Sequence, residues 1–254
     1  NQFKYLQGFK KNFYSIKWFN WEARDIDRIF LNLLTENDWK NVIDTFQKKL
    51  TNTVIDSSVK KLPPQVYAMD ASTISDKLKS RRDVLMKQGL SFYKDLSREV
   101  NILGSNQQEY FKVQNADNGG VQVIVYKKKT KNDSTGIMYS RTFTPKVTKE
   151  LRLYGLNGND KFEIDENVNS KIKIRMIGGK GSDTFNLKGN VRNYVYDITV
   201  SDTSRKLERN VIINTHKTKV LLSSSPQVNE YKPYGYTYNT YSFPQFNLGF
   251  NPED

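Results

Sequence analysis

The sequence predicts an α+β fold, in which an N-terminal helical part precedes an antiparallel β-meander and a short two-coil β-solenoid-like element. Three observations lead to this prediction. Apolar residues recur at helical spacing up to residue 98, strand-like alternation follows, and one strand–turn–strand unit occurs twice near residue 150. We therefore expect a helical subdomain over residues 1–98, a β subdomain over residues 99–225 and an extended aromatic tail over residues 226–254.

End signals define the helices expected in the first part. Residues 35–38 resemble a capping box, because an acid stands at the third helical position after a threonine. The Pro-Pro pair at 63–64 should stop the helical stretch before it, since proline lacks an N–H and clashes with the preceding turn. Ser72 or Thr73 is then expected to cap a long helix that ends near Arg98.

Turn residues define the first strands of the second part. Residues 108–114 and 120–127 flank Asp117-Asn118-Gly119, which is a hairpin signal. A further strand is expected over residues 137–143. These three segments form the predicted meander.

An internal repeat is the most informative feature of the sequence. Residues 150–164 (ELRLYGLNGNDKFEI) align without gaps with residues 173–187 (KIRMIGGKGSDTFNL). Five of the fifteen positions are identical: Arg152/Arg175, Gly155/Gly178, Gly158/Gly181, Asp160/Asp183 and Phe162/Phe185. Tandem units of equal length predict two stacked coils, with Phe162 and Phe185 pointing inward and stacked on each other.

The second copy of the repeat matches the calcium-binding nonapeptide G-G-x-G-x-D-x-U-x, and the first copy departs from it at Leu156. Glycines allow positive-φ turns and bring carbonyl oxygens together, and aspartate supplies the hard oxygen that calcium prefers. The candidate ligands are the carboxylates of Asp160 and Asp183 and the backbone of Gly155, Gly158, Gly178 and Gly181.

The alternative is that Asp160 and Asp183 only form their own turns. Calcium β-rolls repeat the nonapeptide in an unbroken array, whereas only two separated copies occur here, one starting at Gly155 and one at Gly178. This spacing favours stacked coils without metal. We expect no cofactor, with calcium as the one ion that the sequence leaves open.

Composition limits the chemistry that the chain can perform. The absence of cysteine excludes disulfides and thiol nucleophiles, and His216 is the only histidine. No P-loop or G-x-S-x-G elbow is present, so we expect no enzymatic activity. The net charge of +13 favours anionic partners such as anionic lipid. Nucleic acid is disfavoured as a partner, because the charges are scattered and no known nucleic-acid-binding pattern appears.

The C-terminal tail contains eight aromatic residues between Tyr231 and Phe250, interrupted by prolines and glycines. Such a segment suits a membrane–water interface or a docking strand. The residues expected to contact a membrane or partner are Tyr234, Tyr236, Tyr238, Phe243 and Phe246. The alternative is an extended tail that packs back over the domain.

Several motifs together resemble the segment just ahead of the barrel in large BamA/TamA-like surface-antigen proteins of Gram-negative envelopes. They are Arg24–Phe30, Asn37-Asp38-Trp39, Lys61-Leu62-Pro63, Leu78–Arg82, Arg141-Thr142-Phe143, Leu151–Gly155, Ile177-Gly178-Gly179 and the ending Leu248–Asp254. The ending is similar to the stretch that opens the barrel in those proteins. The resemblance implies a cell-envelope location at the outer membrane, on its periplasmic or its surface face, and an outer-membrane β-barrel partner in the same or another chain.

The function that the resemblance implies is a non-catalytic binding or spacer module, which positions a partner or client at the barrel. Some proteins of this kind carry a calcineurin-like metallophosphoesterase domain, but its D-x-H and G-N-H-[DE] motifs are absent here. The alternative is therefore an accessory domain of a metallophosphoesterase whose catalytic domain lies outside this chain. Because the sequence begins at Asn1 without a signal peptide, we expect it to be part of a longer protein.

Overall fold

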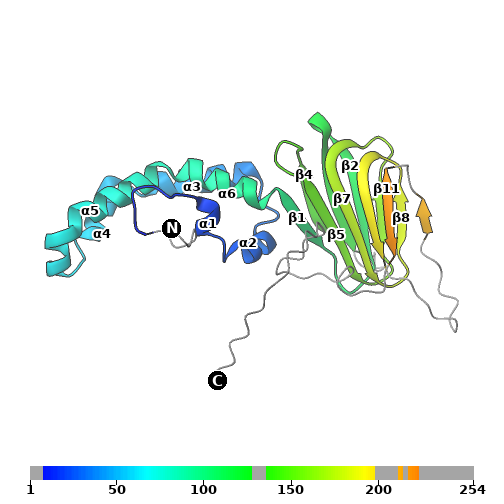
Figure 1. Ribbon diagram of the computed structural model, residues 1–254, viewed down its shortest axis with the longest axis horizontal. Coiled ribbons are helices and arrows are strands. Elements are labelled where there is room, and N and C mark those ends of the chain that lie inside the picture. The colour runs from blue at the N-terminus through cyan, green and yellow to red at the C-terminus, as the bar shows by residue number, and fades with distance from the viewer. Residues whose placement is uncertain (1–7, 128–135, 198–210, 214–216, 223–254) are drawn as a thin grey trace, which may run out of the picture.

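The computed structural model describes residues 8–127, 136–197, 211–213 and 217–222. The helices lie to one side and the strands to the other, and the strands form two sheets that face each other (Figure 1). The predicted α+β class is confirmed at this level.

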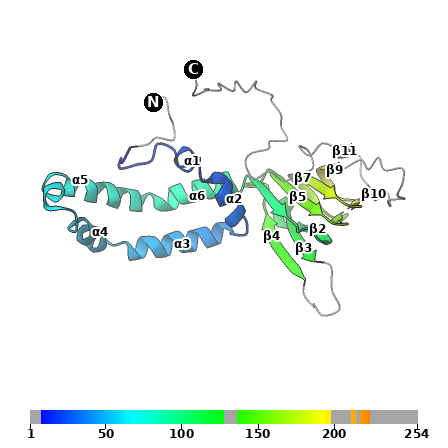
Figure 2. The same ribbon diagram turned by 90° about the horizontal axis from the view of Figure 1, so that it is seen from below.

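The helical part consists of six helices within the described residues. Their bounds are α1 Ile16–Phe19, α2 Arg24–Phe30, α3 Glu36–Lys49, α4 Asn52–Val59, α5 Pro64–Asp83 and α6 Leu85–Leu96. Helix α3 packs along α6, and α4 packs against α5. Helices α3 to α6 thus form a helical hairpin that extends away from the sheets (Figure 2). No helix in the described ranges has both the length and the apolar character needed to cross a membrane.

One predicted helix start is confirmed and another is wrong. Thr35 and Asp38 form the capping box, in which the Thr35 N–H donates to the Asp38 carboxylate over 2.7 Å. Ser72 and Thr73 do not cap a helix, because they lie inside α5, which already begins at Pro64. A proline at the first helical position loses no hydrogen bond, so it starts this helix as well as ending the preceding stretch.

The strands form two sheets. Their bounds are β1 Glu99–Leu103, β2 Glu109–Ala116, β3 Gly120–Lys127, β4 Ile137–Phe143, β5 Glu150–Asn157, β6 Lys161–Ile164, β7 Asn169–Lys180, β8 Thr184–Leu187, β9 Asn190–Asp197, β10 Val211–Ile213 and β11 Thr218–Leu222. The first sheet has the order β1-β5-β7-β9-β11, and all its pairs are parallel. The second sheet has the order β10-β8-β6-β2-β3-β4.

The predicted antiparallel meander is confined to three strands. β2 and β3 pair antiparallel around Asn118 and Gly119, which have φ values of 57° and 69°, and β4 pairs antiparallel with β3. The remaining pairs of the second sheet are parallel. Parallel pairing arises because each strand lies beside its counterpart in the next unit of the chain rather than beside its neighbour across a tight turn.

The predicted register between the two copies of the repeat is confirmed. Glu150 pairs with Lys173 in the first sheet, and Phe162 pairs with Phe185 in the second, as the alignment of the two copies requires. The rings of Phe162 and Phe185 stack with centroids 4.9 Å apart and an interplanar angle of 5°. Both rings lie in the apolar core that fills the space between the two sheets.

Candidate functional site

Three acidic side chains lie one above another at the turns that lead from the first sheet to the second. They are Glu109, Asp160 and Asp183, which we call the carboxylate ladder. The pairing of β2 with β6 and of β6 with β8 puts these three residues at equivalent positions at the start of their strands. Each of the three side chains is only 1% exposed, so all three carboxylates lie inside the protein.

Hydrogen bonds connect the ladder from one turn to the next. Asp183 Oδ1 accepts from the backbone N–H of Asp160, and Asp160 Oδ1 accepts from the backbone N–H of Glu109, both over 2.7 Å. Glu109 Oε2 accepts from the N–H of Ser105 in its own turn over 2.9 Å. Each aspartate therefore satisfies a buried amide of the preceding turn, which would otherwise cost about 1–3 kcal/mol.

Glycines stand beside the carboxylates because they leave room for them. A methyl group on Gly155 would collide with Asp160 Oδ2, and a methyl group on Gly178 would collide with Asp183 Oδ2. The sequence predicted that glycine is needed at these positions for a positive φ. That prediction is wrong for Gly155 and Gly178, because both lie inside strands and neither has a positive φ. The prediction is right for the next glycines, Gly158 and Gly181, whose φ values are 135° and 141°.

Burial changes the acidity of the two aspartates. Burial raises the pKa of Asp160 to about 8. The hydrogen bond from the Glu109 amide acts in the opposite direction and lowers this pKa, whereas the neighbouring charges of Asp183 and Glu109 raise it further. Burial also raises the pKa of Asp183 to about 6, although the hydrogen bond from the Asp160 amide lowers it. The folded protein therefore favours the protonated form of these groups.

The raised pKa values predict a pH dependence of stability. A group whose pKa is higher in the folded state stabilises the protein most at low pH and loses that contribution as pH rises through the folded value. For Asp160 the loss should occur as pH rises from 3.8 towards about 8. The Asp160→Asn variant, which keeps an acceptor oxygen and carries no charge, should lose less stability than the parent between pH 6 and 8 in thermal unfolding. Equal pH dependence in both proteins would contradict this account.

The described residues contain no group of three or more His, Asp or Glu side chains that could hold a metal ion. In the ladder, Oδ1 of Asp160 and of Asp183 faces an N–H hydrogen, which repels a cation. This geometry supports the turn-forming alternative over calcium. We expect the melting temperature to stay unchanged up to about 10 mM calcium, above the range of weak extracellular calcium modules. A rise that the Asp183→Asn variant lacks would establish the calcium site instead.

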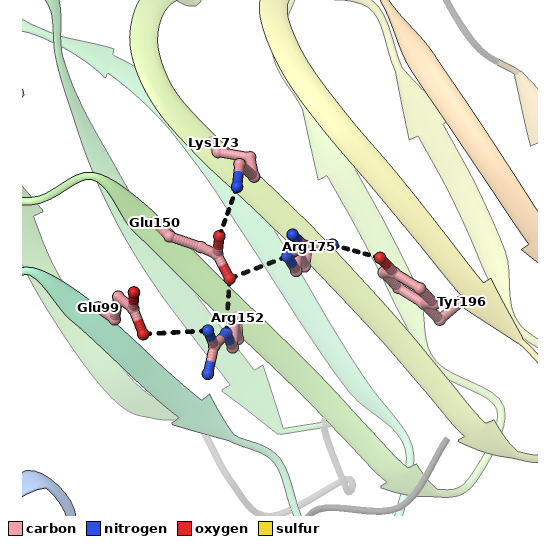
Figure 3. A network of polar contacts seen from close by, with 6 residues as sticks. All are labelled: Glu99, Glu150, Arg152, Lys173, Arg175 and Tyr196. Atoms are coloured by element: carbon pink, nitrogen blue, oxygen red, sulfur yellow. Dashed lines mark hydrogen bonds and ion pairs between the residues drawn. The ribbon is translucent and has the colours of Figure 1, made fainter. Parts of the chain in front are cut away.

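A second polar cluster lies on the outward face of the first sheet (Figure 3). Glu150 accepts from Lys173 over 2.7 Å, from Arg152 Nε over 2.6 Å and from Arg175 Nε over 2.8 Å. Arg175 also donates to the Tyr196 hydroxyl. Burial alone would raise the pKa of Glu150, but the Lys173 hydrogen bond and the two guanidiniums lower it to about 2. Glu150 is therefore ionised and matched by three cations.

The sequence prediction missed one member of the ladder. Residues 99–113 (EVNILGSNQQEYFKV) form a third copy of the unit, in strand register with residues 150–164. The signal for it was present in the identities Glu99/Glu150, Gly104/Gly155, Asn106/Asn157 and Phe111/Phe162. Glu109 occupies the aspartate position of this copy, and the Phe111 ring stacks on that of Phe162 at 4.7 Å.

The remaining sequence predictions fall on other parts of the chain. His216 and the expected contact residues Tyr234, Tyr236, Tyr238, Phe243 and Phe246 lie outside the described residues. Comparison of the chain with family models, curated proteins and solved structures found no significant match.

Proposed function

We propose that this chain is a non-catalytic binding and spacer module of the cell envelope. It positions a partner or client at an outer-membrane β-barrel in the same or a partner chain. In this proposal the stacked strand–turn–strand units form a short β-solenoid that serves as the rigid body of the module. The helical hairpin is the element that reaches the partner.

The observation that carries the proposal is the shape and surface of the helical hairpin. Helices α5 and α6 contain 20 and 12 residues, which corresponds to a length of about 48 Å at 1.5 Å per residue. The hairpin presents apolar side chains to solvent: Val42 is 68% exposed, Phe46 51% and Met69 74%. Val42 and Phe46 are four residues apart on α3, so they lie on one face of that helix. An extended arm with exposed apolar residues suits contact with another protein.

The use of the buried charges supports a non-catalytic role. The aspartates of the carboxylate ladder hold backbone amides, and Glu150 is matched by Lys173, Arg152 and Arg175. These groups stabilise the fold of the sheets. The net charge of +13 adds a salt-sensitive attraction to anionic lipid, which would favour placement at a membrane surface.

The proposal is tested by photo-crosslinking in cells that make the whole protein. A photoreactive amino acid is placed at Val42 or Phe46, and the matched control positions are Asp44 and Lys48, which form an exposed ion pair on the same helix. We expect crosslinks to an outer-membrane β-barrel from positions 42 and 46 and weaker crosslinks from the control positions. Crosslinks only to cytoplasmic proteins, or equal yields at all four positions, would contradict the proposal.

The non-catalytic part has its own test. The purified chain should not hydrolyse p-nitrophenyl phosphate, with or without added divalent metal ions. Turnover that a single substitution within the chain abolishes would contradict the non-catalytic role. It would not change the interpretation of the crosslinking result.

A further inference from the structure

The segment that precedes α1, residues 8–15, contains lysines and aromatic residues but no acidic residue. It forms neither a helix nor a strand, and Figure 2 shows it in dark blue on the side of α5 and α6 opposite to α3. Two hydrogen bonds connect it to α5. Arg81 Nε donates to the Lys10 carbonyl over 2.8 Å, and the Ser80 hydroxyl donates to the Asn12 side chain over 3.4 Å. The segment is therefore held on the surface of the helical hairpin.

Cations and aromatic rings are interleaved where this segment meets α5. The Arg81 guanidinium lies over two rings, 4.5 Å from the centroid of Phe9 and 4.6 Å from that of Phe13. Lys77 Nζ lies 5.4 Å from the Phe9 centroid. Lys77 and Arg81 are four residues apart on α5, so they lie on one face of that helix. We call the following residues the basic aromatic patch: Phe9, Lys10, Lys11, Phe13, Lys77 and Arg81.

The patch is exposed, and its charges are not matched. Within the described ranges, no ion pair joins any of its four cations to a carboxylate. Lys17, the next lysine along the chain, is instead paired with Asp95 over 2.9 Å. The Phe9 side chain is 44% exposed, and so is that of Phe19, which packs edge-on against Phe13 at 5.0 Å. The patch therefore presents positive charge beside apolar rings that are in contact with water.

We propose that the basic aromatic patch binds the anionic surface of a phospholipid membrane. Lysine and arginine are attracted to lipid phosphates, and their long side chains keep the charge among the headgroups while the stem lies against apolar groups. The phenylalanine rings have no polar atom, so they are stabilised by moving from water to the boundary between headgroups and acyl chains. The patch combines both features on one surface.

Lipid fits the patch better than nucleic acid does. Bases bind aromatic side chains by stacking on a ring face, and Arg81 already lies over the rings of Phe9 and Phe13. The assignment rests on the proposed function for the envelope location, because it names the part of the helical hairpin that meets the membrane. Its test uses vesicles without a β-barrel, so the failure of one proposal leaves the other intact.

Flotation of the full chain with phosphatidylcholine vesicles, with and without phosphatidylglycerol, tests the proposal. The parent should bind the vesicles that contain phosphatidylglycerol. The Lys10→Gln/Lys11→Gln variant should bind them at least about tenfold more weakly, since each cation near an anionic surface contributes about fivefold. The matched control is Lys60→Gln/Lys61→Gln, which removes an adjacent pair of exposed lysines between α4 and α5 and changes the net charge equally. The control should bind as the parent does.

A fluorescent label shows whether the patch itself enters the interface. Because the chain has no cysteine, Phe9→Cys provides one thiol for an environment-sensitive dye, and Met69→Cys provides a control at a side chain that is 74% exposed. The dye at position 9 should become brighter when phosphatidylglycerol vesicles are added, and the dye at position 69 should not. Equal weakening by the two lysine pairs, or no change of the dye at position 9, would overturn the proposal. Binding of a single-stranded oligonucleotide by a chain that does not bind vesicles would assign the patch to nucleic acid instead.

Discussion

The Phe162→Ala variant is expected to lose about 3–5 kcal/mol of the free energy of unfolding. The Phe162 ring lies between two other rings, with centroid distances of 4.7 Å to Phe111 and 4.9 Å to Phe185. All three side chains are fully buried, and the rings stack nearly parallel, with interplanar angles of 11° and 5°. Removal of the middle ring therefore leaves a cavity and also removes both stacking contacts.

Urea denaturation followed by circular dichroism measures this loss. The matched control is Phe30→Ala in α2, because Phe30 is 76% exposed and its truncation should change the free energy of unfolding by less than about 0.5 kcal/mol. Phe185→Ala and Phe111→Ala should also be destabilising, but each removes only one of the two ring contacts just described. If Phe162→Ala were no more destabilising than Phe30→Ala, the stacked rings would not be a central part of the core.

The pairing of β5 with β7 and of β6 with β8 could be predicted from the sequence, because one constant offset aligns both apolar positions and turn residues. The copy over residues 99–113 was missed because the spacing changes. Only the short stretch 165–172 separates the copies 150–164 and 173–187, whereas the much longer stretch 114–149 separates residues 99–113 from the copy 150–164. That longer stretch contains the antiparallel strands β3 and β4, which interrupt the period. A search for one constant period cannot detect such an insertion.

The role of the glycines could not be read from the motif alone. The nonapeptide shows where glycine occurs, but it does not show whether glycine supplies a positive φ or space for a neighbour. Leu156 illustrates this ambiguity, since it adopts a φ of 76° at the position where the next copy has Gly179. Gly155 and Gly178 have ordinary backbone angles and are required instead by the carboxylates of Asp160 and Asp183. Only the three-dimensional contacts separate these two reasons.

The burial and ion pairs of Glu150 could not be predicted from the sequence, for a related reason. Glu150 occupies an outward position on a strand, where a charged residue is normally solvated. Its ion pairs come from cations on two strands, which no local pattern encodes. The exposure of the apolar residues of α2 could not be predicted from the sequence either. Ile26 and Phe30 have the helical spacing typical of a buried face, but they are 53% and 76% exposed.

The Glu150→Gln variant is expected to lose about 3–5 kcal/mol of the free energy of unfolding at neutral pH. The amide keeps the shape of the side chain but removes the buried carboxylate charge that Arg152 and Arg175 share, while the Arg152–Glu99 ion pair remains. The control is Glu36→Gln, which removes an exposed ion pair between Glu36 and Lys40 on α3 and should cost less than about 0.5 kcal/mol.

The pH dependence of this loss identifies its cause. The pKa of Glu150 in the folded protein, about 2, is below its ordinary value of 4.5. Ionised Glu150 therefore stabilises the fold above pH 4.5, and this contribution disappears as pH falls from 4.5 towards 2. The difference in unfolding free energy between the parent and Glu150→Gln should decrease over that range, measured in parallel urea titrations. A difference that stays constant with pH would assign the loss to altered packing rather than to the charge of Glu150.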